Sequence, residues 1–199
     1  MDFSSLSEVE IWCLVKSGNQ KAFSYIYSTF SKDLYKYGHK FTQDTNLIED
    51  VIQDLFVHIW DLKKNINIKN SIKFYLFACF RRELIKKIKC AYKNESLEEV
   101  HSKFKWEASF LEILDENQII LESSNKISLA LDQIPLRQKE AIYLRYIQEL
   151  SYEEISKMMD VQVPSVYNLI FKGLKKLKNL LSFTRTSTKF SGLLFLFFQ

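Results

Sequence analysis

The chain has 199 residues and 47% of them are hydrophobic, enough apolar side chain for one packed domain or two small ones. It contains only 4 glycines and 2 prolines, so turns are scarce and the composition predicts an all-α fold. The net charge of +4 is mild, and the 3 cysteines lack the spacing of a metal or redox motif, which excludes a sequence-local metal site.

No segment brings a nucleophile together with a general base, so we expect neither an enzyme nor a small-molecule substrate, and no metal or cofactor. The sequence shows no signal peptide, and its longest apolar run, residues 192–198, is too short to span a bilayer. These features predict a cytoplasmic protein with reduced cysteines and no transmembrane segment.

Charge is distributed unevenly along the chain. Residues 69–93 contain eight basic side chains and one acidic one, whereas residues 95–116 contain seven acidic side chains and two basic ones. Residues 161–181 contain four lysines and no acid. Two basic segments around an acidic one predict two polyanion-binding modules and a linker. We therefore expect two small helical domains, residues 1–92 and 117–182, a flexible acidic linker, residues 93–116, and a tail, residues 183–199.

The first three predicted helices each follow a capping signal. Ser7 with Glu10 forms a capping box, in which each side chain satisfies a free amide of the first turn. Asn19 can cap the second helix, and Asp44 or Thr45 can cap the third. The first helix is predicted to end near residue 16, the second to span about 20–41, and the third to span about 46–62.

The third predicted helix has two contrasting faces. Aliphatic and aromatic side chains recur at helical spacing on one side, and polar, mostly acidic side chains line the other. The polar stripe comprises Glu49, Asp50, Gln53, Asp54 and Asp61. It is either a solvated acidic face or a docking face for a protein partner.

The fourth predicted helix, about residues 71–92, combines aromatic and basic side chains. Phe74, Tyr75, Phe77 and Phe80 precede and interleave with the basic cluster. Aromatic planes stack on unpaired bases and cations neutralise phosphate, so this pattern suits single-stranded nucleic acid. A core helix with basic flanks explains the pattern equally well. The basic cluster comprises Arg81, Arg82, Lys86, Lys87 and Lys89.

The last structured stretch has the layout of a helix-turn-helix. After helices predicted over about 116–133 and from Pro135, a capping box of Ser151 and Glu154 opens a short helix. Asp160 tolerates the left-handed conformation that a sharp exit needs, and a first-turn Pro164 suits the longer, basic helix that follows. This layout is typical of DNA-binding proteins, although an ordinary helical hairpin with a solvated lysine face fits it too.

Three segments carry a resemblance that covers nearly the whole stretch from Lys21 to Leu181. They are EDVIQDLFVHIW (49–60), FYLFACFRRELIKKIK (74–89) and IPLRQKEAIYLRYIQELSYEEIS (134–156). The chain resembles the extracytoplasmic-function (ECF) group of bacterial RNA polymerase sigma factors, and its aromatic, lysine-rich style resembles FecI-like members from Bacteroidetes. The chain departs from the family pattern at Asp160, Ser156, Tyr167, Leu169 and Phe171, and in the pair Arg82-Glu83.

The resemblance implies a transcription initiation factor that binds core RNA polymerase, directs it to specific promoters and helps to melt the minus-ten element. It implies three sets of contacts and a polar loop, residues 63–70, that accepts a flipped base. Core-polymerase contacts fall on Asp50, Gln53, Asp54 and Phe56, and minus-ten contacts on Tyr75, Arg81, Arg82, Lys86 and Lys87. Minus-thirty-five contacts fall on Arg137, Ser165, Asn168, Lys172 and Lys175. An anti-sigma factor is a further candidate partner.

Two other functions compete with this interpretation. A conventional helix-turn-helix regulator explains the C-terminal half but leaves the acidic helix and the aromatic–basic helix without a role. An adaptor or anti-sigma-type protein uses the same faces without touching DNA. A requirement for core polymerase distinguishes a sigma factor from the conventional regulator. Absence of DNA binding at all salt concentrations identifies the adaptor.

Overall fold

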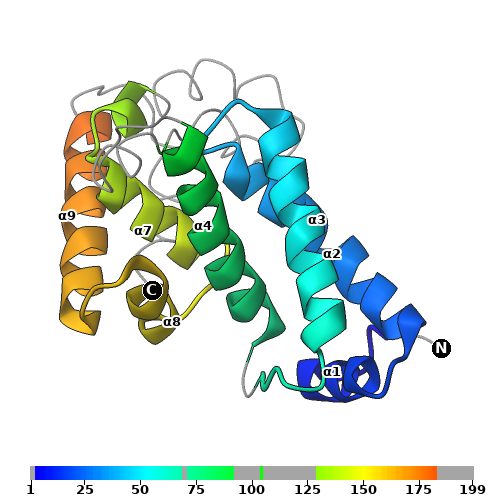
Figure 1. Ribbon diagram of the computed structural model, residues 1–199. Helices are drawn as coiled ribbons and strands as arrows, with labels where there is room; N and C mark the ends of the chain where they lie inside the picture. The colour runs from blue at the N-terminus through cyan, green and yellow to red at the C-terminus, as the bar shows by residue number, and fades with distance from the viewer. Residues whose placement is uncertain (1–2, 69–70, 92–103, 105–128, 183–199) are drawn as a thin grey trace, which may run out of the picture. The chain divides into compact units, whose positions relative to one another are not determined.

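The computed structural model describes residues 3–68, 71–91, 104 and 129–182 (Figure 1). The chain divides into two compact units. All regular secondary structure in these residues is helical, which confirms the predicted all-α fold. The helices described here include none that is long and apolar enough to cross a membrane. Within the same residues, no group of three His, Cys, Asp or Glu side chains is placed to hold a metal ion.

The predicted linker and tail lie outside the described residues, apart from residue 104. The domain boundaries proposed at residues 92, 116 and 182 therefore stay predictions. Of the helix predicted over residues 116–133, only residues 129–133 are described, and residues 129–132 are helical.

The helices of the first unit begin and end close to their predicted bounds. They are α1 (Glu8–Lys16), α2 (Gln20–Gly38), α3 (Thr45–Leu62) and α4 (Ile72–Ala91). The second helix stops about one turn earlier than predicted, at Gly38. A Cβ atom there would lie 2.8 Å from Ile48 Cγ2 and 3.0 Å from Phe80 Cζ. Glycine weakens a helix and permits this close approach of α3 and α4, so the chain turns at this position.

The capping predictions for this unit are confirmed. The Ser7 side chain accepts a hydrogen bond from the amide of Glu10 at 3.3 Å, and Glu10 Oε2 accepts one from the Ser7 amide at 2.8 Å. Asn19 caps α2 through its side-chain oxygen. Asp44, rather than Thr45, caps α3, because the Asp44 carboxylate accepts the amide hydrogen bond three residues later at 3.0 Å.

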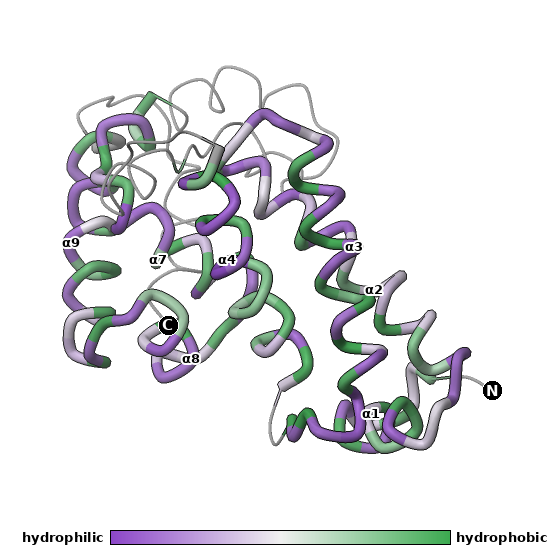
Figure 2. The backbone as a smooth tube through the Cα atoms, in the orientation of Figure 1, coloured by the Kyte–Doolittle hydropathy of each residue, from purple (hydrophilic) through white to green (hydrophobic). Residues whose placement is uncertain are grey.

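Aromatic side chains fill the core where α2 meets α4. Tyr37, Phe77 and Phe80 are fully buried, and the Tyr37 ring centroid lies 5.4 Å from that of Phe77. Polar and apolar residues alternate along each helix at short intervals, as amphipathic packing requires (Figure 2). Two of the four aromatic residues that suggested base stacking are therefore core residues, and only Phe74 and Tyr75 remain partly exposed.

α1 makes two long-range hydrogen bonds, one to the loop after α3 and one to the first residue of α4. Glu8 Oε2 accepts a hydrogen bond from the backbone amide of Ile72 at 2.6 Å, which satisfies a free donor in the first turn of α4. Trp12 Nε1 donates to the carbonyl oxygen of Ile66 at 3.4 Å. α1 therefore holds the described end of the 63–70 loop and the start of α4.

The second unit contains α7 (Leu136–Tyr146), α9 (Val163–Ser182) and the first part of α8 (Tyr152–Met159). α9 packs closely on α7 through Gly173, where a Cβ atom would lie only 2.6 Å from Ile142 Cδ1. The second capping box is confirmed: the Ser151 amide donates to Glu154 Oε2 at 2.8 Å, and Ser151 Oγ accepts from the Glu154 amide.

The turn between α8 and α9 is left-handed at Asp160, as predicted, with φ of 53°. The amide of Val161 donates to the carbonyl oxygen of Ser156 at 3.0 Å, the six-to-one hydrogen bond of a Schellman C-cap. Pro164 lies in the first turn of α9, where the missing N–H breaks no helical hydrogen bond. The predicted helix-turn-helix is therefore built from these local signals.

Candidate protein and nucleic-acid interfaces

The acidic stripe of α3 is exposed along its length. Asp50, Gln53 and Asp54 are all exposed, whereas Val51 and Leu55 between and beside them are buried. The sequence prediction therefore placed the polar stripe on the correct side of the helix. It overlooked Val57, which follows Asp54 by three residues on the same stripe and is 61% exposed. An apolar side chain within an acidic stripe is suited to a protein partner, because removing its apolar surface from water stabilises the complex.

Phe56, a predicted core-polymerase contact, lies beneath this surface instead of on it. It is 4% exposed and packs against two rings of α2, Phe23 at 5.9 Å and Tyr27 at 4.9 Å between centroids. Phe23 also contacts Trp60, with centroids 4.9 Å apart. Tyr27 itself is exposed. Phe56 therefore supports the surface that Tyr27 and the acidic stripe present.

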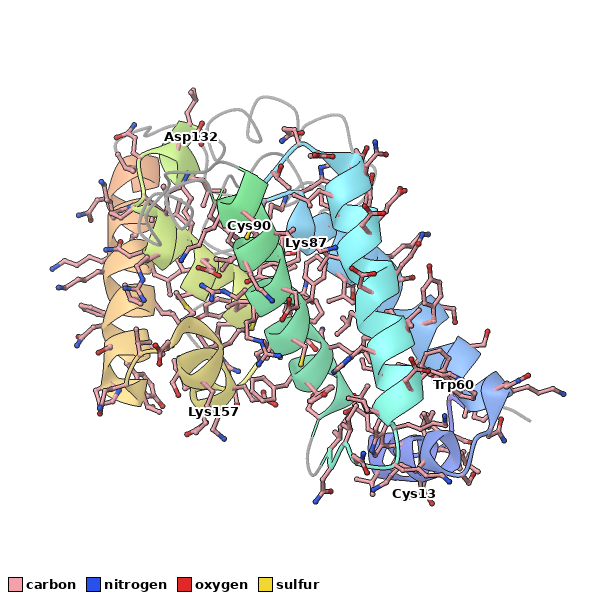
Figure 3. The ribbon with its side chains drawn as sticks, in the orientation of Figure 1. Cys13, Trp60, Lys87, Cys90, Asp132 and Lys157 are labelled. Carbon is pink, nitrogen blue, oxygen red and sulfur yellow. The ribbon has the colours of Figure 1, made fainter. Side chains whose placement is uncertain are left out.

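Two residues predicted to contact different partners form an ion pair with each other. Lys87 Nζ lies 2.7 Å from Asp54 Oδ2, and Lys87 projects between α4 and α3 (Figure 3). The Asp54 side chain is 72% exposed, so this pair is screened by water and contributes about 0–1 kcal/mol. A pair this weak is readily exchanged for a partner's charges.

Three of the five predicted minus-ten residues share one face of α4. Tyr75, Arg82 and Lys86 are separated by seven and four residues, which are close to whole turns of a helix. Arg82 and Lys86 are exposed, and Glu83 lies within 3.7 Å and 3.5 Å of their nitrogen atoms. Arg81 lies off this face and is buried. The structure thus gathers one aromatic and two cationic side chains on a single stripe.

Tyr75 is held as a neutral phenol. Burial raises its pKa to about 12, and the adjacent Cys79 adds to the shift, while Arg82 acts in the opposite direction. Burial also raises the pKa of the Cys79 thiol. Neither group carries negative charge near neutral pH, so neither repels phosphate.

The exposed face of α9 carries the remaining predicted residues. Ser165, Asn168, Lys172 and Lys175 are all exposed, opposite the buried Val166, Ile170 and Leu174. Arg137 is exposed in the first turn of α7.

Sequence analysis missed an aromatic stack beside this face. The rings of Tyr152 and Tyr167 lie 3.9 Å apart with an angle of 11° between them. The guanidinium of Arg145 lies 5.0 Å from the Tyr152 ring and donates to the carbonyl oxygen of Leu150 at 3.0 Å. The residues involved come from three elements, so no spacing in the sequence indicated their contact.

Comparisons with known proteins match both units. Residues 26–93 match the family model of Sigma-70 region 2, and residues 124–177 match that of Sigma-70, region 4. The chain is 25% identical over 164 residues to the ECF RNA polymerase sigma factor SigX of Bacillus subtilis (strain 168), covering 80% of this chain and 83% of SigX. It is 24% identical over 170 residues to SigW of the same organism, covering 82% and 91%.

The fold is also similar to a solved structure. This is the sigma factor RpoE in complex with the anti-sigma factor NepR from Bartonella quintana, with a TM-score of 0.56 and 17% identity. The similarity covers 83% of this chain and 99% of that one. At this level of identity the likeness concerns the fold alone.

Proposed function

The chain belongs to the ECF group of RNA polymerase sigma factors, which bind core polymerase and direct it to specific promoters, and we propose how its exposed faces divide that work. Proteins of this family are transcription initiation factors and not enzymes. The observation that carries the division is that an acidic stripe on α3 and an aromatic–basic stripe on α4 belong to the same unit. One stripe suits a protein partner and the other suits DNA.

Core polymerase docks on α3 through Asp50, Gln53 and Asp54, with Val57 as the apolar contact. The resemblance implies that the partner surface is the clamp helices of the largest polymerase subunit. Charge complementarity sets the association rate and the register, while burial of Val57 and Tyr27 supplies apolar area. Phe56 acts from below by holding the Tyr27 ring in place.

The α4 stripe of Tyr75, Arg82 and Lys86 receives the opened strand of the minus-ten element. Stacking on an aromatic ring contributes roughly 1–3 kcal/mol per base, and phosphate neutralisation adds to it. Lys87 joins this set once polymerase has taken over the Asp54 carboxylate, and the 63–70 loop accepts a flipped base. Arg81 is buried, so we leave it out of this set.

The second unit reads the minus-thirty-five element as a duplex. α9 enters the major groove, where Ser165, Asn168 and Lys172 contact bases or phosphates. Lys175 and Arg137 contact phosphate on either side. Both partners of this factor, polymerase and promoter DNA, place its site of action in the cytoplasm. An anti-sigma factor is a further proposed partner, by analogy with the NepR complex of RpoE.

The alternative functions explain less. A conventional helix-turn-helix regulator accounts for α7 to α9 and leaves the Sigma-70 region 2 match over residues 26–93 without a role. A non-DNA-binding adaptor leaves the cationic stripe of α4 and the lysines of α9 without a role.

Run-off transcription tests the proposal. Purified bacterial core polymerase is supplied with this chain and with the DNA upstream of the chain's own gene as template. A defined transcript that requires the chain supports the function. Tight duplex binding by the chain alone, with no binding to core polymerase, contradicts it and favours the conventional regulator.

A charge reversal then tests the α3 face. Asp50→Lys reverses one charge of the stripe and leaves Asp54 and Lys87 themselves unchanged, and we expect it to lower the affinity for core polymerase at least tenfold. Glu153→Lys makes the same charge change on the exposed surface of α8 and serves as the matched control. Equal polymerase affinity of the two variants would argue against docking through α3.

A further inference from the structure

Two large aromatic side chains stand on the exposed face of α9. Tyr167 is 52% exposed and Phe171 is 62% exposed, although the buried side of the same helix is already filled. They are four residues apart, so they lie on successive turns of the same side. Asn168 lies between them in sequence, and Lys172 follows directly. Such exposure of apolar rings on a recognition helix indicates a ligand with apolar groups.

The first of these rings is held in a defined orientation. Tyr167 stacks on Tyr152 of α8 at 3.9 Å, and Arg145 of α7 covers the neighbouring ring at 5.0 Å. Arg145 is in turn anchored by its hydrogen bond to the Leu150 carbonyl. A ring fixed in this way loses little side-chain entropy when a ligand binds.

The charge around the rings favours duplex DNA as that ligand. Residues 161–181 contain four lysines and no acid, and Lys172 and Lys175 are exposed beside Phe171. The major groove of duplex DNA lies between two negatively charged phosphate backbones, so it complements this positively charged surface. The helix rises about 6 Å between Tyr167 and Phe171, so the two rings reach different base pairs.

The major groove displays one apolar group, the 5-methyl group of thymine, and it displays it at every A·T pair. We propose that Tyr167 and Phe171 contact thymine methyl groups in the minus-thirty-five element, so that this chain requires A·T pairs at those positions. Asn168 between them has the side chain that pairs with the N6 and N7 atoms of adenine. This assignment rests on the proposed function, because it takes α9 as the helix that reads the duplex.

Replacement of thymine by deoxyuridine tests the contact, since it removes only the methyl group. Holoenzyme is assembled from core polymerase and the full chain, and it selects binders from a pool of promoter duplexes with randomised upstream sequence. Each thymine of the selected minus-thirty-five segment is then replaced singly by deoxyuridine. We expect two positions at which affinity falls by about fourfold, the effect of one methyl-sized apolar group.

Variants separate the aromatic contacts from the electrostatic ones. In Phe171→Ala, one of the two deoxyuridine effects disappears, and the salt dependence of binding is unchanged. In Lys172→Ala, both deoxyuridine effects persist, and the salt slope falls by about one. Tyr167→Phe keeps the ring and retains its deoxyuridine effect, whereas Tyr167→Ser loses it. Circular dichroism of each variant confirms that the helices remain folded.

Three failures have different meanings. If holoenzyme enriches a sequence but no deoxyuridine substitution weakens binding, the thymine contact is wrong and the proposed function stands. If Phe171→Ala keeps both deoxyuridine effects, the contact belongs to other residues. If holoenzyme enriches no sequence at all, the proposed function fails together with this inference.

Discussion

At the scale of single residues, the ion pair of Asp54 and Lys87 joins two faces that we propose for different partners. Each side chain lies on the edge of its own stripe, and their charged atoms are 2.7 Å apart. In the free chain the lysine charge is therefore partly neutralised. Under the proposed function, polymerase binding at Asp54 makes that charge available for DNA, because the cost of separating the pair is small.

A double-mutant cycle measures this pair. Asp54→Asn and Lys87→Met each remove one charge, and we expect a coupling of at most about 1 kcal/mol in the free energy of unfolding, because the pair is solvent-exposed. Urea denaturation of the four proteins provides the measurement. A coupling well above 2 kcal/mol would show that the pair is a structural element and not an exchangeable one.

Tyr75 makes the stability depend on pH in the alkaline range. Its pKa is about 12 in the folded chain and near the model-peptide value of about 10 in the unfolded chain. Between these values the unfolded state loses a proton that the folded state keeps, so stability falls as pH rises through this window. We expect Tyr75→Phe to lose less stability than the unmodified chain between pH 10 and pH 12, as followed by urea denaturation. Equal pH slopes of the two proteins in that window would contradict the burial of this phenol.

At the scale of elements, one helix of the first unit caps another. Glu8 of α1 supplies the acceptor for the first turn of α4, 64 residues away in the sequence. The same helix donates from Trp12 to the Ile66 carbonyl. α1 thus holds Ile66, within the loop that we assign to the flipped base, and the first residue of α4.

Removing this cap isolates its contribution. Glu8→Ala should lower the unfolding free energy by about 1 kcal/mol, the usual cost of a lost N-terminal cap. Hydrogen exchange at the Ile72 amide should accelerate at the same time. Glu10→Ala, which breaks only the local capping box of α1, is the matched control and should leave the Ile72 amide protected. Unchanged exchange at Ile72 in Glu8→Ala would refute the cap.

The contact of α7 with α9 depends on the absence of a side chain at position 173. Gly173→Ala places a methyl group 2.6 Å from Ile142 Cδ1, and we expect a loss of about 1–3 kcal/mol from overpacking. The gain in helix propensity of about 1 kcal/mol offsets part of it. Ile142→Val removes the obstructing Cδ1 atom, so the double variant should recover stability in thermal or urea unfolding. A double variant less stable than Gly173→Ala alone would contradict this packing.

At the scale of the whole molecule, we expect promoter choice to depend on both units acting on one polymerase. Each face taken alone is small and is built from exposed side chains, so neither unit should hold a promoter tightly by itself. Joint engagement on the polymerase converts two weak contacts into one selective contact. The spacing of the two promoter elements is then part of the specificity.

Changing that spacing tests joint engagement. Inserting about five base pairs between the two elements turns one of them by half a helical turn relative to the other, and we expect run-off transcription to be lost. The same insertion upstream of the minus-thirty-five element should leave the transcript intact. Transcription that survives the internal insertion would show that one element is sufficient.

The sequence by itself determined the features that arise within a few residues. The two capping boxes, Ser7 with Glu10 and Ser151 with Glu154, join groups three residues apart, so their spacing alone predicts the hydrogen bonds. The same holds for the left-handed turn at Asp160 and for the polar stripe of α3. Together with the three family segments, these signals were sufficient for the all-α fold and for the family.

Only the tertiary structure decided which of the candidate side chains reach the surface and which ones meet. Phe56, Phe77 and Phe80 carry aromatic rings in suggestive positions, yet each is buried because neighbouring helices pack over it. Asp54 with Lys87 and Tyr152 with Tyr167 pair across helices, at separations that no helical period encodes. Helix-local hydrogen bonds depend on spacing along the chain, whereas these contacts depend on how the helices pack, which a single sequence does not specify residue by residue.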